Sequence, residues 1–194
     1  MLELLTIVYA KPTLLNNMTK DSVDTIKLSG GLKDTFKKRQ ETMVQRFDVF
    51  DTTITIINAH LTSGKECFAD RSEDVKRIFE EAFQKDKFGM VQEDIIHKSD
   101  HIFMFGSLNF RLGGDDYWVR NIASGMDSRN DSEWTEEELN KFDQLLAVDE
   151  FVTFGPQDWY LKDFKEAKIT FGPTCKYDTN TQRFNTDSKH VCSW

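Results

Sequence analysis

The alternation of apolar and polar residues along the chain is clearest over residues 42–61. Successive side chains of a strand point to opposite faces, so alternation predicts a strand with one buried face. The segment TITIIN (53–58) is rich in β-branched residues, which favour strands. We therefore predict a hairpin of two strands, 42–50 and 53–61, joined at a turn around Asp51-Thr52.

Three shorter apolar runs predict further strands. Residues 2–10, LELLTIVYA, read as a buried or half-buried strand that ends at Pro12, because proline cannot donate to a strand ladder. Residues 101–105 predict a buried strand running into Gly106, and residues 168–171 a last short strand. Strands and helices thus mix without the regular alternation of a doubly wound sheet, which favours an α+β sandwich of sheets flanked by helices.

Helical spacing appears twice. Between residues 70 and 85 apolar side chains recur every three or four positions and form one core-facing stripe: Val75, Ile78, Phe79, Ala82 and Phe83. Thr135 and Glu138 have the spacing of a capping box, in which each side chain binds the other residue's main-chain amide. They predict the start of a helix with an inward-facing stripe: Leu139, Phe142, Leu145 and Leu146.

The composition predicts one globular domain over residues 1–194, with 39% hydrophobic and 12% aromatic residues. A net charge of −8 argues against non-specific binding to nucleic acid or to an anionic membrane. Three cysteines without metal-site spacing predict free thiols in a reducing compartment. The N-terminus lacks a basic region before its apolar run, so we expect no signal peptide, no membrane span and an intracellular location.

Three polar segments follow predicted strands, and their residue types suit phosphate binding. In NAHL (58–61), the imidazole of His60 can donate to a phosphate oxygen or transfer a proton near neutral pH. In GSLNFR (106–111), Asn109 can donate to a phosphoryl oxygen and Arg111 can bind a phosphate through two parallel hydrogen bonds. Taken alone, the first is more simply a histidine at a strand end, and the second an ordinary surface loop.

The third segment, PTCKYD (173–178), offers the Lys176 ammonium and the Tyr177 hydroxyl, although alone it is an ordinary turn. His97 and His101 are four residues apart, but the strand-like pattern after His101 argues against the shared helical face that a metal pair needs. We therefore predict no metal site from these histidines.

Taken jointly, these segments resemble the inositol polyphosphate 5-phosphatases of the endonuclease/exonuclease/phosphatase superfamily. Four stretches match that family in its order and spacing. They are LTIVYAKPTL with VDTIKLSGG, VFDTTITIINAHLTSGKECFADRSED with the Asn-x-His-Leu signature, IFMFGSLNFRL, and FKEAKITFGPTCKYD with the residues that follow it.

The resemblance implies a partial four-layer α/β/β/α sandwich with the active site at one end. In active members a Mg²⁺ ion and a polar cage stabilise in-line attack of water on a phosphate of inositol phosphates or phosphoinositides. By position, His60 would contact the scissile phosphate and Asn109 would hold its oxygen. Arg111, Lys176 and Tyr177 would line the site or bind the ring phosphates.

The departures from the family pattern bear directly on activity. Ser107 stands where the family has the aspartate that activates water, and a neutral hydroxyl is a poor proton acceptor. Loss of a positioned general base costs roughly 10²–10⁴-fold in rate. The family's glycine-rich loop is replaced by KRQE (38–41). Its metal-binding glutamate would precede residue 1 and its closing Asp-His pair would follow Trp194, so we expect no metal or other cofactor in this chain.

Two hypotheses about function follow. The first is a catalytically degenerate pseudoenzyme that serves as a structural or binding subunit of a larger assembly, with neighbouring chains covering its open sheet edges. Arg111 and Lys176 would then leave an inositol phosphate as a candidate ligand. The second is a fragment of an active Mg²⁺-dependent phosphatase that removes the 5-phosphate. A nuclease of the same superfamily is disfavoured by the acidic charge balance.

Overall fold

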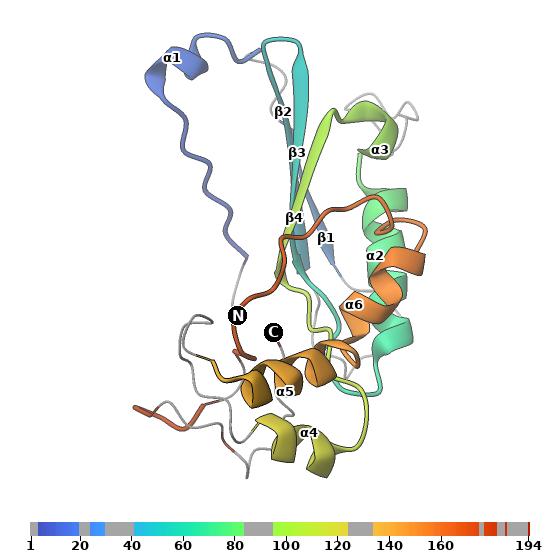
Figure 1. The fold of residues 1–194 in the computed structure, drawn as a ribbon. Coiled ribbons are helices and arrows are strands. Elements are labelled where there is room, and N and C mark those ends of the chain that lie inside the picture. Colours follow the sequence, from blue (N-terminus) through green and yellow to red (C-terminus); the bar gives the residue numbers. More distant parts are fainter. Residues whose placement is uncertain are drawn as a thin grey trace. The chain divides into compact units, whose positions relative to one another are not determined.

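The structure, a computed structural model, describes residues 4–19, 24–29, 41–83, 95–123, 134–174, 177–181, 185 and 194. The chain divides into two compact units, Met1–Asn109 and Phe110–Trp194. Strands and helices occur together in the first unit, and helices dominate the described part of the second (Figure 1). Within these ranges, none of the helices has the length and apolar character needed to cross a bilayer.

The first unit is built on a four-stranded sheet in the order β1-β2-β3-β4 (Figure 1). Strands β1 (Asp24–Ser29), β2 (Glu41–Val49) and β3 (Thr52–His60) are antiparallel neighbours. Strand β4 (His101–Ser107) pairs with β3 in parallel. A parallel pair needs a crossover connection, and the chain between β3 and β4 carries helices α2 (Phe68–Glu81) and α3 (Ile95–Lys98).

The predicted hairpin is confirmed as β2 and β3, with the turn one residue earlier than expected. Phe50 and Asp51 form the turn, and Phe50 adopts a left-handed φ of 58°. The Thr53 hydroxyl donates to the Asp48 carboxylate at 2.7 Å beside this turn. At the same end, the Thr53 amide donates to the Asp100 carboxylate at 2.7 Å, which fixes where β4 begins against β3.

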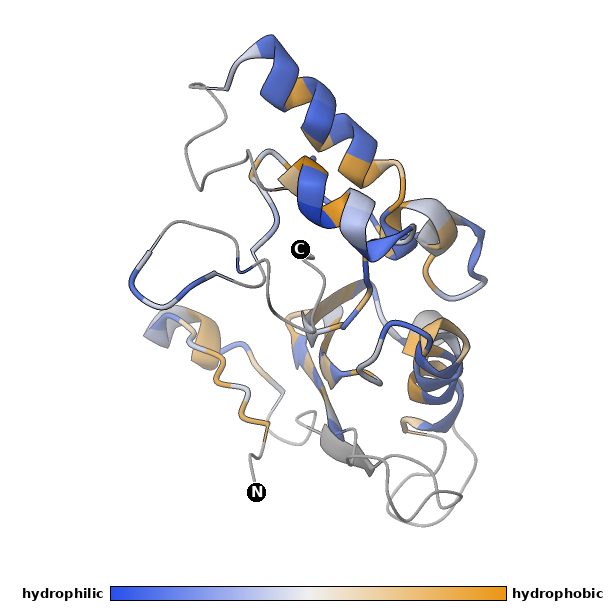
Figure 2. Cartoon of the chain, turned by 90° about the horizontal axis from the view of Figure 1, so that it is seen from below, coloured by the Kyte–Doolittle hydropathy of each residue, from blue (hydrophilic) through white to orange (hydrophobic). Residues whose placement is uncertain are grey.

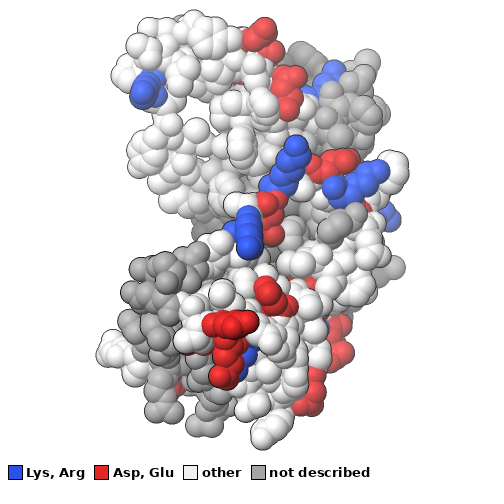
Figure 3. All heavy atoms as spheres, viewed as in Figure 1, with Lys and Arg blue, Asp and Glu red and all other residues white. Residues whose placement is uncertain are grey.

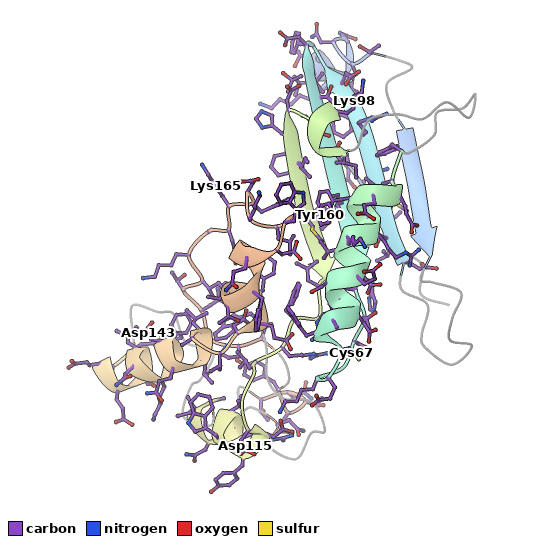
Figure 4. All side chains as sticks on the ribbon, turned by 90° about the vertical axis from the view of Figure 1, so that its right-hand side faces the viewer. Cys67, Lys98, Asp115, Asp143, Tyr160 and Lys165 are labelled. Atoms are coloured by element: carbon purple, nitrogen blue, oxygen red, sulfur yellow. The ribbon has the colours of Figure 1, made fainter. Side chains whose placement is uncertain are left out.

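Helix α2 covers one face of this sheet (Figures 1 and 4). The predicted helix is confirmed over residues 70–81, and its apolar stripe is buried, including Ala82 and Phe83 just beyond the helix end. The alternate sheet residues Val44, Ile57 and Ala59 are fully buried. Figure 2 shows hydrophobic and hydrophilic residues alternating along the helices, as amphipathic packing requires.

The strand predicted over residues 2–10 is wrong for its described part. Residues 4–11 form no strand, and the chain then enters the short helix α1 (Pro12–Leu15). Apolar side chains of this segment are largely exposed: Leu5, Ile7, Val8 and Tyr9. It contacts the sheet through the Asn58 amide, which donates to the Leu5 carbonyl at 3.3 Å and to the Thr6 hydroxyl at 3.2 Å. An apolar run alone cannot form a strand without a partner ladder.

The strand predicted over residues 101–105 is confirmed as β4, but the prediction that it is buried is wrong. Phe103 and Phe105 are 57% and 47% exposed. Both lie on the same face of β4, opposite to the face that carries Ile102 and Met104. Because β4 is an edge strand in the described sheet, its phenylalanines have sheet neighbours on one side.

The second unit has a helical core. Helices α4 (Asp116–Ala123) and α5 (Glu136–Leu146) share one buried cluster with Leu112 and Trp134, which lie outside both helices. Its helical members are Val119, Ala123, Phe142 and Leu145. The predicted capping box is confirmed, since the Glu138 amide donates to the Thr135 hydroxyl and the Thr135 amide to the Glu138 carboxylate. Leu139, which we expected to face inward, is 43% exposed and does not belong to this stripe.

The rest of the second unit follows α5 through helix α6 (Glu150–Phe154) and a 3₁₀ turn, Gly155–Gln157. The short strand predicted over residues 168–171 is wrong, because these residues form no strand. Ile169 packs against the core cluster instead, and the Phe171 carbonyl accepts a hydrogen bond from the Trp194 indole at 2.7 Å. A side-chain donor replaces the strand ladder at that carbonyl.

Candidate functional site

The carboxyl ends of β3 and β4 bring His60 and Ser107 together. The two strands are parallel, and these residues are paired in register as the last residue of each strand. The pairing continues one step further, since the Leu61 amide donates to the Ser107 carbonyl at 3.0 Å. His60 is half-buried and Ser107 is exposed, so a polar ligand can reach the hydroxyl.

Gly106 makes this close pairing possible. It has a φ of 129°, and a Cβ atom there would lie 2.1 Å from the Ala59 carbonyl oxygen. Any side chain would therefore collide with the backbone of β3. Gly106 thus allows β4 to approach β3 just before Ser107.

Asn109 completes the cluster in the first unit. Its φ of 59° is left-handed, a conformation that asparagine adopts more readily than most residues. Its side-chain Nδ2 donates to the Leu61 carbonyl at 2.8 Å. This bond joins the segment after β4 to the segment after β3. His60, Ser107 and Asn109, predicted separately from two sequence segments, therefore lie at one end of the sheet.

Two residues of α2 that the sequence interpretation missed hold the segment after β3. The Arg71 guanidinium is fully buried and its Nη1 donates to the carbonyls of Thr62 at 3.1 Å and Gly64 at 2.7 Å. The Asp74 carboxylate accepts from the Thr62 amide at 2.8 Å and from its hydroxyl at 2.7 Å. Figure 4 shows α2 with Cys67 at its start, just before these residues. The available signal was Arg71 itself, a charged residue in register with the apolar stripe of α2.

Arg111 and Tyr177 belong to the second unit. The main chain of Arg111 is held by Glu150, whose carboxylate accepts from the Arg111 amide at 2.9 Å and whose amide donates to the Arg111 carbonyl at 3.0 Å. The Tyr177 hydroxyl donates to the Pro173 carbonyl at 3.0 Å, and its ring packs against the core cluster. Lys176 lies outside the described residues. That these three residues join His60 in one site stays a prediction.

Charges of both signs are interspersed on the described part of the molecule. Figure 3 shows lysines and arginines beside acidic residues on the face that it draws. Lys141 forms an ion pair with Glu137 at 2.7 Å, and Arg77 forms one with Glu81 at 2.9 Å. The Arg77 guanidinium, chiefly through its hydrogen bonds, lowers the pKa of the Glu81 carboxyl. On this face the described charges do not form the broad positive field that non-specific phosphate binding requires.

The side chains at the end of β3 and β4 do not fit Mg²⁺. They offer one imidazole, one hydroxyl and one carboxamide, whereas Mg²⁺ is held in proteins by carboxylate oxygens and phosphates. Over the described ranges, no three histidine, cysteine or acidic side chains gather into a group that could hold a metal ion. We therefore derive no catalytic step through a metal from this chain's described residues.

Comparison with known proteins gives one consistent family. The model of endonuclease/exonuclease/phosphatase family 2 matches residues 1–194. Human phosphatidylinositol 3,4,5-trisphosphate 5-phosphatase 1 is 26% identical over 91% of the chain, and human synaptojanin-2 is 28% identical over 94%. A probable inositol polyphosphate 5-phosphatase of Schizosaccharomyces pombe is 30% identical over 78%. The chain spans 14%, 11% and 13% of the length of these relatives, respectively.

The solved structures agree on the fold. The inositol polyphosphate 5-phosphatase domain of a synaptojanin, in complex with inositol (1,4)-bisphosphate and calcium, has a TM-score of 0.67 at 23% identity. That match covers 94% of this chain and 46% of the solved one. Cimex nitrophorin, a ferrous NO complex, has a TM-score of 0.56 at 14% identity, so the fold alone does not fix the chemistry. The predicted α+β fold class is confirmed, and the chain belongs to endonuclease/exonuclease/phosphatase family 2.

Proposed function

We propose that this chain is a catalytically degenerate relative of the inositol polyphosphate 5-phosphatases that binds phosphorylated inositol groups without hydrolysing them. The observation that carries the proposal is the pairing of His60 with Ser107 at the end of two parallel strands. The residue beside the imidazole is a neutral hydroxyl. A hydroxyl can donate to a phosphate oxygen, but it is a weak acceptor for the proton of an attacking water.

The ligand class follows from the donors and from the relatives. His60, Ser107 and Asn109 present hydrogen-bond donors of the kinds that suit phosphoryl oxygens. Several relatives are named as phosphatases of phosphoinositides, and the related synaptojanin domain was solved with inositol (1,4)-bisphosphate. We therefore assign a phosphorylated inositol, free or as a lipid headgroup, to this end of the sheet. From the resemblance, Arg111, Lys176 and Tyr177 remain candidates for contacts to the other phosphates of the ligand.

A structural or binding role in a larger assembly is supported by exposed apolar surface. Phe103 and Phe105 of the edge strand β4 are among the exposed large hydrophobic residues. Exposed phenylalanines side by side on an edge strand favour contact with another polypeptide surface. Together with Ser107, they support a subunit rather than a free-standing enzyme.

The alternative is a fragment of an active Mg²⁺-dependent phosphatase that removes the 5-phosphate. The geometry that favours it is the retained cluster of His60 and Asn109, joined through the hydrogen bond of Asn109 to the Leu61 carbonyl. Activity would then require carboxylates supplied from outside the described residues and a base in place of Ser107.

Phosphorus NMR of one sample separates binding from cleavage. The full chain is mixed with inositol 1,4,5-trisphosphate and Mg²⁺, and the phosphate resonances are followed over hours. We expect shifted or broadened ligand resonances, weaker perturbation with His60→Ala, and no growing signal of free phosphate. Free phosphate that accumulates with wild type and not with His60→Ala would establish the alternative. Unperturbed ligand resonances would remove the binding role.

A further inference from the structure

We infer that Arg71 and Asp74 of α2 are positioning residues for this site, because they fix the segment that places Asn109 beside His60 and Ser107. The expected effect on binding rests on the proposed phosphate-binding function. The positioning of Asn109 itself rests only on contacts within the first unit. Neither residue touches the proposed ligand. They act through Thr62 and Leu61.

The burial of Arg71 is the first step. The side chain occupies a position on the inward face of α2, four residues before Val75, where an aliphatic residue would suffice for packing alone. A charge removed from water is costly unless it is hydrogen-bonded. The Nη1 of Arg71 meets this requirement through the carbonyls of Thr62 and Gly64, whereas its buried Nε makes no hydrogen bond within the described part of the chain. Packing alone gives no reason for a guanidinium here, whereas holding two carbonyls of one turn does.

Asp74 holds the same segment, residues 62–64, through the amide and the hydroxyl of Thr62. The amide and the hydroxyl of Thr62 both donate to one oxygen of its carboxylate. Thr62 is buried, and its carbonyl is bound by Arg71. Hydrogen bonds to charged groups are shorter and stronger than neutral ones. The main chain two residues after His60 is therefore fixed by two side chains of opposite charge from a single helix.

The main chain next to this fixed segment holds Asn109. Leu61 lies between His60 and Thr62, and its carbonyl accepts the Asn109 side chain while its amide donates to the Ser107 carbonyl. A left-handed asparagine persists where surrounding contacts hold it. If this segment moves, Asn109 loses the acceptor that orients its carboxamide. The hydrogen bond from the Leu61 amide to the Ser107 carbonyl, which extends the pairing of His60 with Ser107, is weakened as well.

The test compares Arg71→Lys and Asp74→Asn with Arg77→Lys, a matched control on the same helix whose partner is Glu81. Side-chain amide resonances of Asn109 report its bond to Leu61, and calorimetry with inositol hexakisphosphate reports binding. We expect both variants to shift the Asn109 amide resonances and to weaken binding about tenfold, as loss of a supporting residue does at other sites. Arg77→Lys should change neither.

Unchanged Asn109 side-chain amide resonances in both folded variants would overturn the inference. Residues that only stabilise the fold would lower the melting temperature when replaced but would leave these resonances unchanged. Should Arg71→Lys fail to fold, Asp74→Asn and Thr62→Val carry the same test, because Thr62→Val removes only the hydroxyl contact to Asp74. A wild-type chain that gives no heat with inositol hexakisphosphate contradicts the proposed function. The amide resonances then still decide whether Arg71 and Asp74 position Asn109.

Discussion

His60 and Ser107 are the last residues of two parallel strands and are paired in register. This relationship places an imidazole and a hydroxyl at one end of the sheet, with the hydroxyl in the position that the resemblance assigns to a catalytic aspartate. The consequences for stability and activity can be measured residue by residue.

Gly106→Ala should destabilise the first unit by about 3 kcal/mol or more, or prevent folding, because the new Cβ would collide with the Ala59 carbonyl oxygen. Gly155→Ala is the matched control. A Cβ there meets the Phe151 ring at an ordinary 3.7 Å, so its effect should stay within about 0.5 kcal/mol. Urea unfolding of both variants measures the difference, and equal effects would show that β3 and β4 are not this close.

Phe79→Ala and Phe103→Ala should separate the covered face of the sheet from the exposed one. Phe79 is 1% exposed, so its truncation should cost about 3–5 kcal/mol. Phe103 is 57% exposed, so its loss should cost less than about 1 kcal/mol in the isolated chain. Denaturant unfolding gives both values. A large loss with Phe103→Ala would mean that β4 is covered in solution, and sedimentation would show whether a second copy covers it.

Thr135→Ala removes half of the capping box at the start of α5. The Glu138 amide loses its acceptor, and we expect a loss of about 1 kcal/mol in the free energy of unfolding. Thr170→Ala, at an exposed position in the same unit, serves as the control and should have little effect. Thermal unfolding followed by circular dichroism compares the two. Identical melting temperatures would contradict a stabilising cap.

The pH dependence of stability should carry a signature of Asp149. Burial raises the pKa of this carboxyl, with the amides of Val152 and Phe151 opposing the shift and the charge of Glu150 adding to it. A raised folded-state pKa gives stability that is complete below the unfolded-state pKa and is lost as the pH rises through the folded-state pKa. Asp149 also caps α6 through the Val152 amide, a role that asparagine can keep.

Asp149→Asn should therefore gain stability relative to wild type as the pH rises above the usual range for an aspartate. Urea unfolding at several pH values between moderately acidic and neutral measures this difference. Carboxyl groups that do not interact with Asp149 cancel in it. Glu166 does not cancel, because the charge of Asp149 helps to raise its pKa, and removing that charge acts in the same direction. A difference that is constant with pH, or that shrinks as the pH rises, would contradict the raised pKa.

Local patterns predicted the elements whose structure depends on neighbours in sequence. The β2–β3 hairpin and helix α2 were confirmed because alternation and helical spacing specify them directly. Residues 2–10 form an apolar run that suggests a strand, but a strand also needs a partner ladder, and no pattern within one segment supplies it. For the same reason the apolar run of β4 predicted a strand, but it could not show that Phe103 and Phe105 would be left exposed.

The candidate site was predictable where its residues follow strands. His60 and Ser107 end two strands and Asn109 follows the second, and parallel pairing brings such ends together. Arg71 and Asp74 were missed because they lie within a helix whose stripe was interpreted as packing alone. A charged residue in register with that stripe is the sign that a buried polar partner exists, and here the partner is the main chain of Thr62 and Gly64.

Phosphate release from vesicles of phosphatidylinositol 4,5-bisphosphate, measured with a range of Mg²⁺ concentrations, tests the central claim most directly. Because the residue paired with His60 is a serine, whose hydroxyl is a weak proton acceptor, we predict that wild type releases phosphate no faster than His60→Ala at every Mg²⁺ concentration. Release by wild type that rises with Mg²⁺ and is abolished by His60→Ala would contradict the proposal that this chain binds phosphorylated inositol without cleaving it.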